Sequence, residues 1–215
     1  MIESILTSDI AATESFGDRT QPGLHREEAA LVEAAVETRR REFTTGRICA
    51  RDALAKLGGP TGPILRGGRG EPLWPKGYFG SITHCAGYRA AAVGRLGSIQ
   101  AVGIDAEPAA ALPDGVLDAI SLPEERRELA TIMNSSAPLP FDRLLFSAKE
   151  SVFKSCYSLS EIALDYEDAL ITFSRDGSFK VSVLHRQAGM AIPRSLEGRW
   201  MVEGGFAVTA LSITG

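Results

Sequence analysis

The sequence has few cysteines, no long hydrophobic run and no strong excess of either charge. Cys49, Cys85 and Cys156 lie far apart and lack the spacing of metal ligands, which argues against a disulfide framework and a zinc site. We interpret all three as small buried residues. No apolar stretch approaches the roughly 20 residues that a membrane helix needs. Residues 1–16 carry acids in place of the basic and apolar regions of a signal peptide, so we expect a cytoplasmic protein.

The net charge of −4 does not favour binding to nucleic acid. With 215 residues, 44% hydrophobic and 23% charged, the chain can form one sizeable core or two small ones fused. The charge is uneven, however, because residues 39–69 hold many basic side chains against only Glu42 and Asp52. These basic residues are Arg39, Arg40, Arg41, Arg47, Arg51, Lys56, Arg66 and Arg69. This distribution predicts a local anion site, such as one for phosphates.

Apolar residues at steps of three and four predict several helices. One is expected over residues 25–57, ended by Gly58, and the first part of its apolar face is Leu31, Ala34, Ala35 and Thr38. Helix signals return over 114–120 and after Ser121, a plausible N-cap, and residues 134–140 form a connection. The best-defined helix spans 141–157, with a core stripe of Phe141, Leu145, Ala148, Val152 and Cys156.

Short apolar and alternating segments predict strands over 78–85, 90–94, 101–107, 170–173, 179–184, 198–202 and 206–211. Turn residues between the later segments indicate an antiparallel sheet. Each half of the chain therefore offers helices and a few strands, which predicts an α+β fold of two similar lobes. We place the junction near Gly103, with an N-terminal lobe of residues 1–103 and a C-terminal lobe of residues 104–215.

Two carboxylates, Asp105 and Glu107, follow one another on the predicted strand 101–107. Side chains on a strand alternate between faces, so both point the same way. Like charges emerging together from an apolar strand resist desolvation unless a cation neutralises them, and Mg²⁺ takes oxygen ligands. The alternative is a strand that ends at the surface with two solvated acids, closed by Pro108.

Other polar residues have both a functional and an ordinary interpretation. Arg66 and Arg69 lie in a Gly- and Pro-rich loop over 65–75, which suits either phosphate binding or a plain hairpin. His84 ends a strand and is either a phosphate donor or a structural residue. Two further pairs share a helix face, either for function or as ordinary surface features: Arg40 with Arg47, and Glu150 with Lys154.

Four motifs occur together in one order: Gly70-Glu71-Pro72, Ser81-Ile82-Thr83-His84, Val102-Gly103-Ile104-Asp105-Ala106-Glu107, and Phe146-Ser147-Ala148-Lys149-Glu150-Ser151-Val152-Phe153-Lys154. Over residues 39–157 this pattern resembles the 4′-phosphopantetheinyl transferases. It is most similar to the single-chain, actinobacterial kind that acts on carrier proteins of nonribosomal peptide, polyketide and siderophore synthesis. The chain departs from the family at Thr83, where Ser is frequent, and at Ser151, where Ala is frequent.

The resemblance implies a pseudo-twofold pair of α+β lobes with coenzyme A in the cleft between them. It implies Mg²⁺, with Mn²⁺ as the alternative, held by Asp105, Glu107 and Glu150. It assigns Lys154 and His84 to the phosphates. The residues it assigns to the nucleotide and 3′-phosphate are Arg39 or Arg40, Arg47, Arg66, Arg69 and Thr83, and the assignment among Arg39, Arg40 and Arg41 is ambiguous by one residue.

The implied reaction is attack of a carrier-protein serine on the phosphate nearer the pantetheine. Glu150 would be the base, directly or through a metal-bound water, with Lys154 stabilising or protonating the departing 3′,5′-ADP. We expect a monomer whose partners are coenzyme A and apo carrier proteins, with neither nucleic acid nor membrane, and docking over 115–140 by analogy. The alternatives are a Mg²⁺-dependent nucleotide pyrophosphate hydrolase and a non-catalytic module that binds coenzyme A or a carrier.

Overall fold

The computed structural model describes residues 1–134, 139–184 and 192–215. Its helical elements are η1 (Ile2–Ile5), α1 (Arg26–Ala30), α2 (Glu37–Lys56), α3 (Val116–Ile120), α4 (Pro123–Asn134), α5 (Phe141–Ser160) and η2 (Tyr166–Asp168). Its strands are β1 (Ile10–Ser15), β2 (Leu65–Arg66), β3 (Pro72–Leu73), β4 (Tyr78–Cys85), β5 (Tyr88–Arg95), β6 (Ile99–Pro108), β7 (Ala169–Phe173), β8 (Ser178–Val183), β9 (Ser195–Glu203) and β10 (Phe206–Thr214). The described residues include no helix long and apolar enough to cross a membrane.

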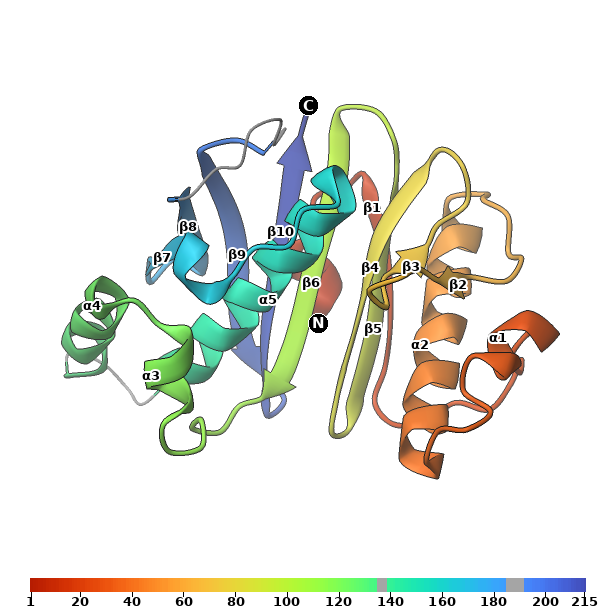
Figure 1. The fold of residues 1–215 in the computed structure, drawn as a ribbon, viewed down its shortest axis with the longest axis horizontal. Coiled ribbons are helices and arrows are strands. Elements are labelled where there is room, and N and C mark those ends of the chain that lie inside the picture. The colour runs from red at the N-terminus through yellow and green to blue at the C-terminus, as the bar shows by residue number, and fades with distance from the viewer. Residues whose placement is uncertain (135–138, 185–191) are drawn as a thin grey trace.

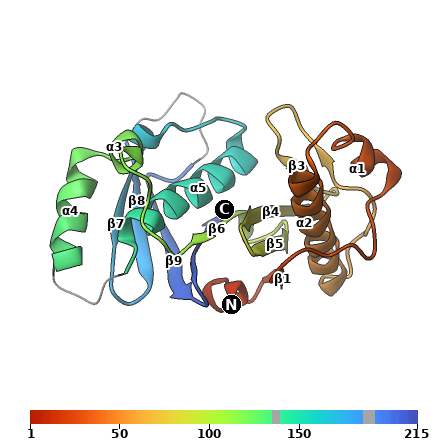
Figure 2. The same ribbon diagram turned by 90° about the horizontal axis from the view of Figure 1, so that it is seen from below.

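The strands form antiparallel sheets, with order β1-β5-β4 in one and β6-β10-β9-β8-β7 in the other, plus the small hairpin β2-β3. Helix α2 covers the three-stranded sheet, and α5 lies across the five-stranded one (Figure 1). Seen from below, β6 and α5 lie in the middle, with α1 and α2 to one side and α3 and α4 to the other (Figure 2). The predicted α+β class with antiparallel sheets and packed helices is confirmed.

Helix α5 buries the predicted stripe: Phe141, Leu145, Ala148, Val152 and Cys156 are all 2% exposed or less. They pack with residues of the five-stranded sheet in one apolar cluster. Burying a large apolar side chain contributes about 1.5–3 kcal/mol, so this stripe holds α5 on the sheet. Glu150 and Lys154 lie off this stripe, and Lys154 reaches Asp105 of β6.

Helix α5 approaches β6 closely at Gly103. A Cβ atom added there would lie 1.8 Å from the carbonyl oxygen of Ser151 and 2.8 Å from the amide nitrogen of Ser155. Glycine at this position lets the helix backbone lie directly against the strand. The contact places Glu150 and Lys154, which flank Ser151 on the helix, beside the second half of β6.

Hydroxyl groups of β4 join the two larger sheets. Ser81 Oγ accepts a hydrogen bond from the amide of Ile104 at 3.2 Å, and Thr83 Oγ1 accepts one from the amide of Ala106 at 3.1 Å. Side chains of one sheet therefore satisfy backbone donors of the other. The expected boundary between residues 103 and 104 falls inside β6, and the division into lobes 1–103 and 104–215 stays a prediction.

The prediction of one helix over 25–57 is wrong, because α1 ends at Ala30 and α2 begins at Glu37. Ala34 and Thr38, expected on an apolar face, are exposed. The guanidinium of Arg40 donates to the carbonyls of Ala35 and Glu33, at 2.8 and 2.5 Å. In a continuous helix these carbonyls would accept backbone amides instead, so the Arg40 side chain takes the place of helical hydrogen bonds at the break.

Two further expectations are corrected near α3 and α4. Ser121 does not cap α4: its hydroxyl donates to the carbonyl of Leu117, and the helix begins at Pro123. Instead, the amide of Leu122 donates a hydrogen bond to Oε2 of Glu125, three residues further on, at 2.8 Å. The connection expected over 134–140 falls partly on residues 135–138, which lie outside the described part of the chain.

Candidate active site

Asp105 lies on β6 where β4 and α5 meet, and its side chain is 5% exposed. Its Oδ1 atom lies 2.7 Å from the Lys154 ammonium nitrogen and accepts a hydrogen bond from the Thr83 hydroxyl at 3.1 Å. Its Oδ2 atom is buried with no hydrogen-bond partner. A solvated acid at a strand end therefore does not describe Asp105. The carboxylate has one oxygen fully engaged and a second available to a cation.

Glu107 lies two residues further along the same strand, and its side chain is 19% exposed. Its Oε2 atom lies 3.3 Å from Nη1 of Arg143, whose other nitrogens donate to the carbonyls of Ala110 and Ala111. Burial and the nearby Asp105 carboxylate raise the pKa of Glu107, while Arg143 opposes that rise. Sequence reasoning missed Arg143, because it lies on the first turn of α5 and only the fold brings it to β6.

Glu150 and Lys154 share a face of α5 without pairing with each other as a surface ion pair. Lys154 bonds to Asp105 and to the carbonyl of Ile104 at 3.2 Å. Glu150 Oε1 accepts a hydrogen bond from the Tyr166 hydroxyl at 3.0 Å. Burial and the Glu150 carboxylate raise the pKa of Tyr166 above its usual range. Sequence reasoning missed Tyr166 as well.

The three carboxylates expected to hold a metal are Asp105, Glu107 and Glu150. Among the described residues, no three His, Cys, Asp or Glu side chains are arranged to hold an ion. Asp105 and Glu107 are instead paired with Lys154 and Arg143. The donor set still suits a hard divalent cation, because it is made of carboxylate oxygens and the buried Oδ2 of Asp105 lacks a partner.

His84 lies near the end of β4 within a charged cluster. Its Nε2 atom lies 2.6 Å from Nη1 of Arg39, and its Nδ1 atom lies 3.6 Å from Oε2 of Glu42. Burial lowers the pKa of His84, and the Arg39 guanidinium adds to that effect against the Glu42 carboxylate. Arg39, which the sequence could not separate from Arg40, is therefore the arginine beside His84. The Arg40 guanidinium instead donates to carbonyls of the turn between α1 and α2.

Arg41 and Arg47 have partners other than His84. Arg41 pairs with Asp18 at 3.3 Å. Arg47 is 5% exposed, with its guanidinium 4.3 Å from the Phe43 ring centroid and its Nε donating to the carbonyl of Ile64 at 2.8 Å. Burial lowers the pKa of Arg47 to about 10. Arg40 and Arg47 thus hold different backbone segments, Arg40 at the α1–α2 turn and Arg47 at Ile64.

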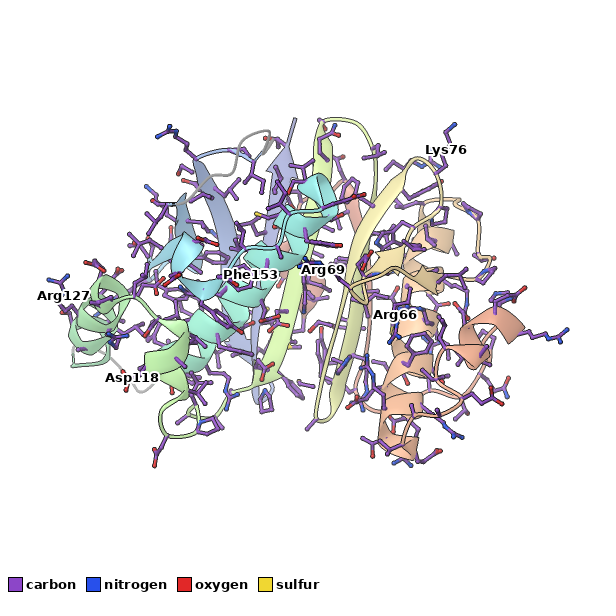
Figure 3. All side chains as sticks on the ribbon, viewed as in Figure 1. Arg66, Arg69, Lys76, Asp118, Arg127 and Phe153 are labelled. Carbon is purple, nitrogen blue, oxygen red and sulfur yellow. The ribbon has the colours of Figure 1, made fainter. Side chains whose placement is uncertain are left out.

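A cavity of about 670 Å³ opens beside Lys154, between helix α5 and the strands β2, β3 and β4. The β2–β3 hairpin and β4 line one side, including Arg69 and Trp74, and α5 lines the other, including Phe153 and Tyr157. Figure 3 shows Arg69 on the α5 side of the hairpin. Its guanidinium lies 5.8 Å from the Tyr157 ring centroid. Lys154 is the residue that the cavity shares with the carboxylate site, and Arg69 faces Tyr157 across the cavity.

Two family models match the chain. The model described as the 4′-phosphopantetheinyl transferase N-terminal domain matches residues 27–94, and that of the 4′-phosphopantetheinyl transferase superfamily matches residues 101–210. Among curated proteins, the chain is 46% identical to the 4′-phosphopantetheinyl transferase PptT of Mycobacterium tuberculosis, covering 98% of this chain and 95% of the relative. It is 45% identical to Svp of Streptomyces mobaraensis, covering 99% and 89%. It is 33% identical to enterobactin synthase component D of Salmonella typhi, covering 84% and 75%.

Proposed function

The chain belongs to the 4′-phosphopantetheinyl transferase superfamily, and from that premise we propose that it transfers the 4′-phosphopantetheine group of coenzyme A to a serine of apo carrier proteins. The products are the holo carrier and 3′,5′-ADP. The observation that carries this proposal is the environment of Asp105. This buried carboxylate is paired with Lys154 through one oxygen and has the other free, and Lys154 also lines the cavity beside α5.

Basic side chains and hydrogen-bond donors on both sides of the site support binding of a pyrophosphate. Arg39 and His84 approach from the N-terminal lobe, and Lys154 approaches from α5. Arg66 and Arg69 lie on the hairpin beside the cavity, so they suit the nucleotide end and its 3′-phosphate. Arg47 would act indirectly: it donates to the carbonyls of Ile64 and Leu65 and so positions the backbone just before Arg66. The pantetheine arm then lies along α5 within the cavity.

In the transfer step, the serine oxygen of the carrier forms a bond to the phosphorus nearer the pantetheine, and the bond from that phosphorus to 3′,5′-ADP breaks. Glu150 takes the serine proton, directly or through a water. Lys154 neutralises the charge that develops on the departing phosphate. Thr83 and Ile104 hold the Asp105–Lys154 pair so that this ammonium stays beside the site.

We infer a divalent metal held by Asp105, Glu107 and Glu150, with Mg²⁺ preferred over Mn²⁺ because all the donors are hard oxygens. When bound, it would supply positive charge to the pyrophosphate oxygens. Binding requires Lys154 and Arg143 to share or release the carboxylates they hold in this structure. The buried, unpartnered Oδ2 of Asp105 supports this assignment.

The carrier partner is proposed to dock near α3 and α4, which occupy most of residues 115–134. These helices flank α5, on the same lobe as Glu150 (Figure 2). Relatives named enterobactin synthase component D support a carrier of siderophore synthesis as one partner class.

The test incubates the protein with coenzyme A and Mg²⁺, with and without an apo carrier, and records the intact mass of the carrier and the release of 3′,5′-ADP. We expect the carrier to gain one phosphopantetheine group, with 3′,5′-ADP released only in its presence. Release at an undiminished rate without carrier would indicate a nucleotide pyrophosphate hydrolase. Binding of coenzyme A without modification of any carrier would indicate a non-catalytic module. Either outcome overturns the proposal.

A further inference from the structure

Tyr166, the first residue of η2, lies beside the reacting carboxylates although it belongs to none of the sequence motifs. The chain leaves the end of α5 and runs back along that helix before η2 (Figure 1). This return brings the Tyr166 hydroxyl to 3.0 Å from Oε1 of Glu150. Within the described part of the chain, the Tyr166 hydroxyl is the group that donates a hydrogen bond to the Glu150 carboxylate.

The ring of Tyr166 is held by two aromatic side chains of α5. Its centroid lies 5.2 Å from that of Phe153 and 6.4 Å from that of Phe146, with tilted planes in both contacts. Phe146, Glu150 and Phe153 are successive neighbours at steps of four and three on the same helix face. The phenol therefore lies over the turn that carries Glu150.

The backbone of Tyr166 is fixed by a buried lysine. Lys149, whose side chain is fully buried, donates from Nζ to the carbonyl of Tyr166 at 2.6 Å and to that of Ala169 at 2.9 Å. The same ammonium lies 2.9 Å from Oε2 of Glu125. The other oxygen of Glu125, Oε1, accepts a hydrogen bond from the amide of Ile171 at 2.8 Å. Lys149 is thus the neighbour of Glu150 in sequence, yet it points inward and anchors η2.

From these contacts we propose that Tyr166 is a positioning residue for Glu150, an inference that rests on the proposed transferase function. The hydroxyl occupies one carboxylate oxygen and so fixes the rotation of the carboxylate group, which directs the other oxygen. Without that bond the terminal torsion of Glu is broad, and the carboxylate samples orientations that do not meet the serine hydroxyl. Lys149, Phe146 and Phe153 make the arrangement rigid by holding the backbone and the ring.

The test compares Tyr166→Phe with Tyr88→Phe, alone and with Glu150→Gln. Tyr166→Phe removes the hydroxyl but keeps the ring between Phe146 and Phe153. Tyr88→Phe is the matched control, because the Tyr88 hydroxyl donates to the Glu14 carboxylate at 2.6 Å, outside the site. For each variant we would measure kcat, the KM values for coenzyme A and carrier, coenzyme A binding by calorimetry, and the midpoint of thermal unfolding.

We expect Tyr166→Phe to lower kcat roughly tenfold, a loss typical of one hydrogen bond to a charged group. Both KM values and coenzyme A binding should stay within about twofold of wild type, and Tyr88→Phe should lower the unfolding midpoint without lowering kcat. In the Glu150→Gln background, Tyr166→Phe should cost much less than tenfold, because the two residues act as one unit.

Three results would overturn the inference while leaving the transferase proposal in place: wild-type kcat in Tyr166→Phe, a loss confined to KM, or an equal loss in the Glu150→Gln background. If Tyr166→Phe loses its fold, Lys149→Arg replaces it as the probe, since it alters the anchor of the Tyr166 carbonyl and keeps the hydroxyl. A normal kcat in a folded Lys149→Arg variant would then count against positioning through η2. Wild-type protein that modifies no carrier would overturn the proposed function itself.

Discussion

The ammonium nitrogen of Lys154 lies 2.7 Å from Oδ1 of Asp105, and it joins helix α5 to strand β6 at the candidate active site. Thr83 of β4 donates to the same carboxylate oxygen. One strand from each of the two larger sheets and helix α5 therefore converge on one buried carboxylate. The pair is also asymmetric, since Asp105 is 5% exposed and Lys154 is 31% exposed at their side chains. The lysine can move toward a ligand while the aspartate stays fixed.

Replacing Asp105 should separate function from folding. We expect Asp105→Ala to lower carrier modification roughly 100-fold or more, a loss typical of removing one essential charge or donor from a site. The fold should remain, because the part-exposed Lys154 can turn to solvent. Carrier mass spectrometry and circular dichroism test this. Asp114→Ala, in an exposed loop position after β6, is the control and should retain wild-type activity. Activity retained in Asp105→Ala would remove this carboxylate from the mechanism.

Gly103 allows a second prediction, on stability and activity together. A methyl group there would meet the Ser151 carbonyl at 1.8 Å, so Gly103→Ala must push α5 away from β6. We expect a loss of about 3 kcal/mol in the free energy of unfolding, at the upper end for overpacking, with reduced transfer by the protein that still folds. Urea denaturation measures the first effect. Gly62→Ala, where nothing lies within 4 Å, should change stability by less than about 0.5 kcal/mol.

What the sequence predicted depends on the range of the interactions involved. The α5 stripe was predicted because a regular period of buried residues is a local signal, and the same holds for Asp105 and Glu107 on one face of β6. The break between α1 and α2 was missed because Arg40 competes for carbonyls that a local pattern assigns to the helix. Strand order was also beyond local patterns, since β10 lies between β6 and β9.

At the site too, contacts between residues that are far apart in the sequence were not predicted. Arg143 reaches Glu107 across 36 residues, and Tyr166 reaches Glu150 across 16, so no spacing in the sequence indicates either pair. Motif residues were predicted from the family resemblance, which carries no information about such supporting contacts. Lys149 illustrates the difference, because it lies inside a motif yet pairs with Glu125 in the core.

Removing one member of the buried Lys149–Glu125 pair should destabilise the fold more than removing both. Removing one member of a buried ion pair leaves an uncompensated charge, which costs about 3–5 kcal/mol. We therefore expect Lys149→Met to lower the free energy of unfolding by that amount. Adding Glu125→Gln should restore part of it, since the stranded charge is gone and the amide oxygen can still accept the Ile171 amide. Denaturant titrations of both singles and the double variant give the coupling energy. Strict additivity would contradict the prediction.

Glu14 should make stability depend on pH. Burial alone would raise the pKa of its carboxyl, but hydrogen bonds from the Met1 amine, Tyr88 and Ile2 outweigh this and lower the pKa below its ordinary value of 4.5. A carboxyl with a depressed pKa in the folded state stabilises the fold above its unfolded pKa, and this contribution is lost as pH falls through the folded value. Glu14→Gln should therefore be less stable than wild type at pH 7, by about 1–3 kcal/mol for lost bonds to a charged group. The difference should shrink as pH drops below about 4.

Urea titrations of protein with a free Met1 amine, at pH 7 and again near pH 3.5, measure this change. Glu3→Gln is the matched control, because Glu3 is an exposed acid in the same N-terminal segment, and it should change stability by less than about 0.5 kcal/mol at either pH. A stability difference for Glu14→Gln that persists undiminished at the lower pH would mean that packing, and not the carboxylate charge, accounts for the role of Glu14. In that case hydrogen bonds from the Met1 amine and the Tyr88 hydroxyl would not account for the lowered pKa of Glu14.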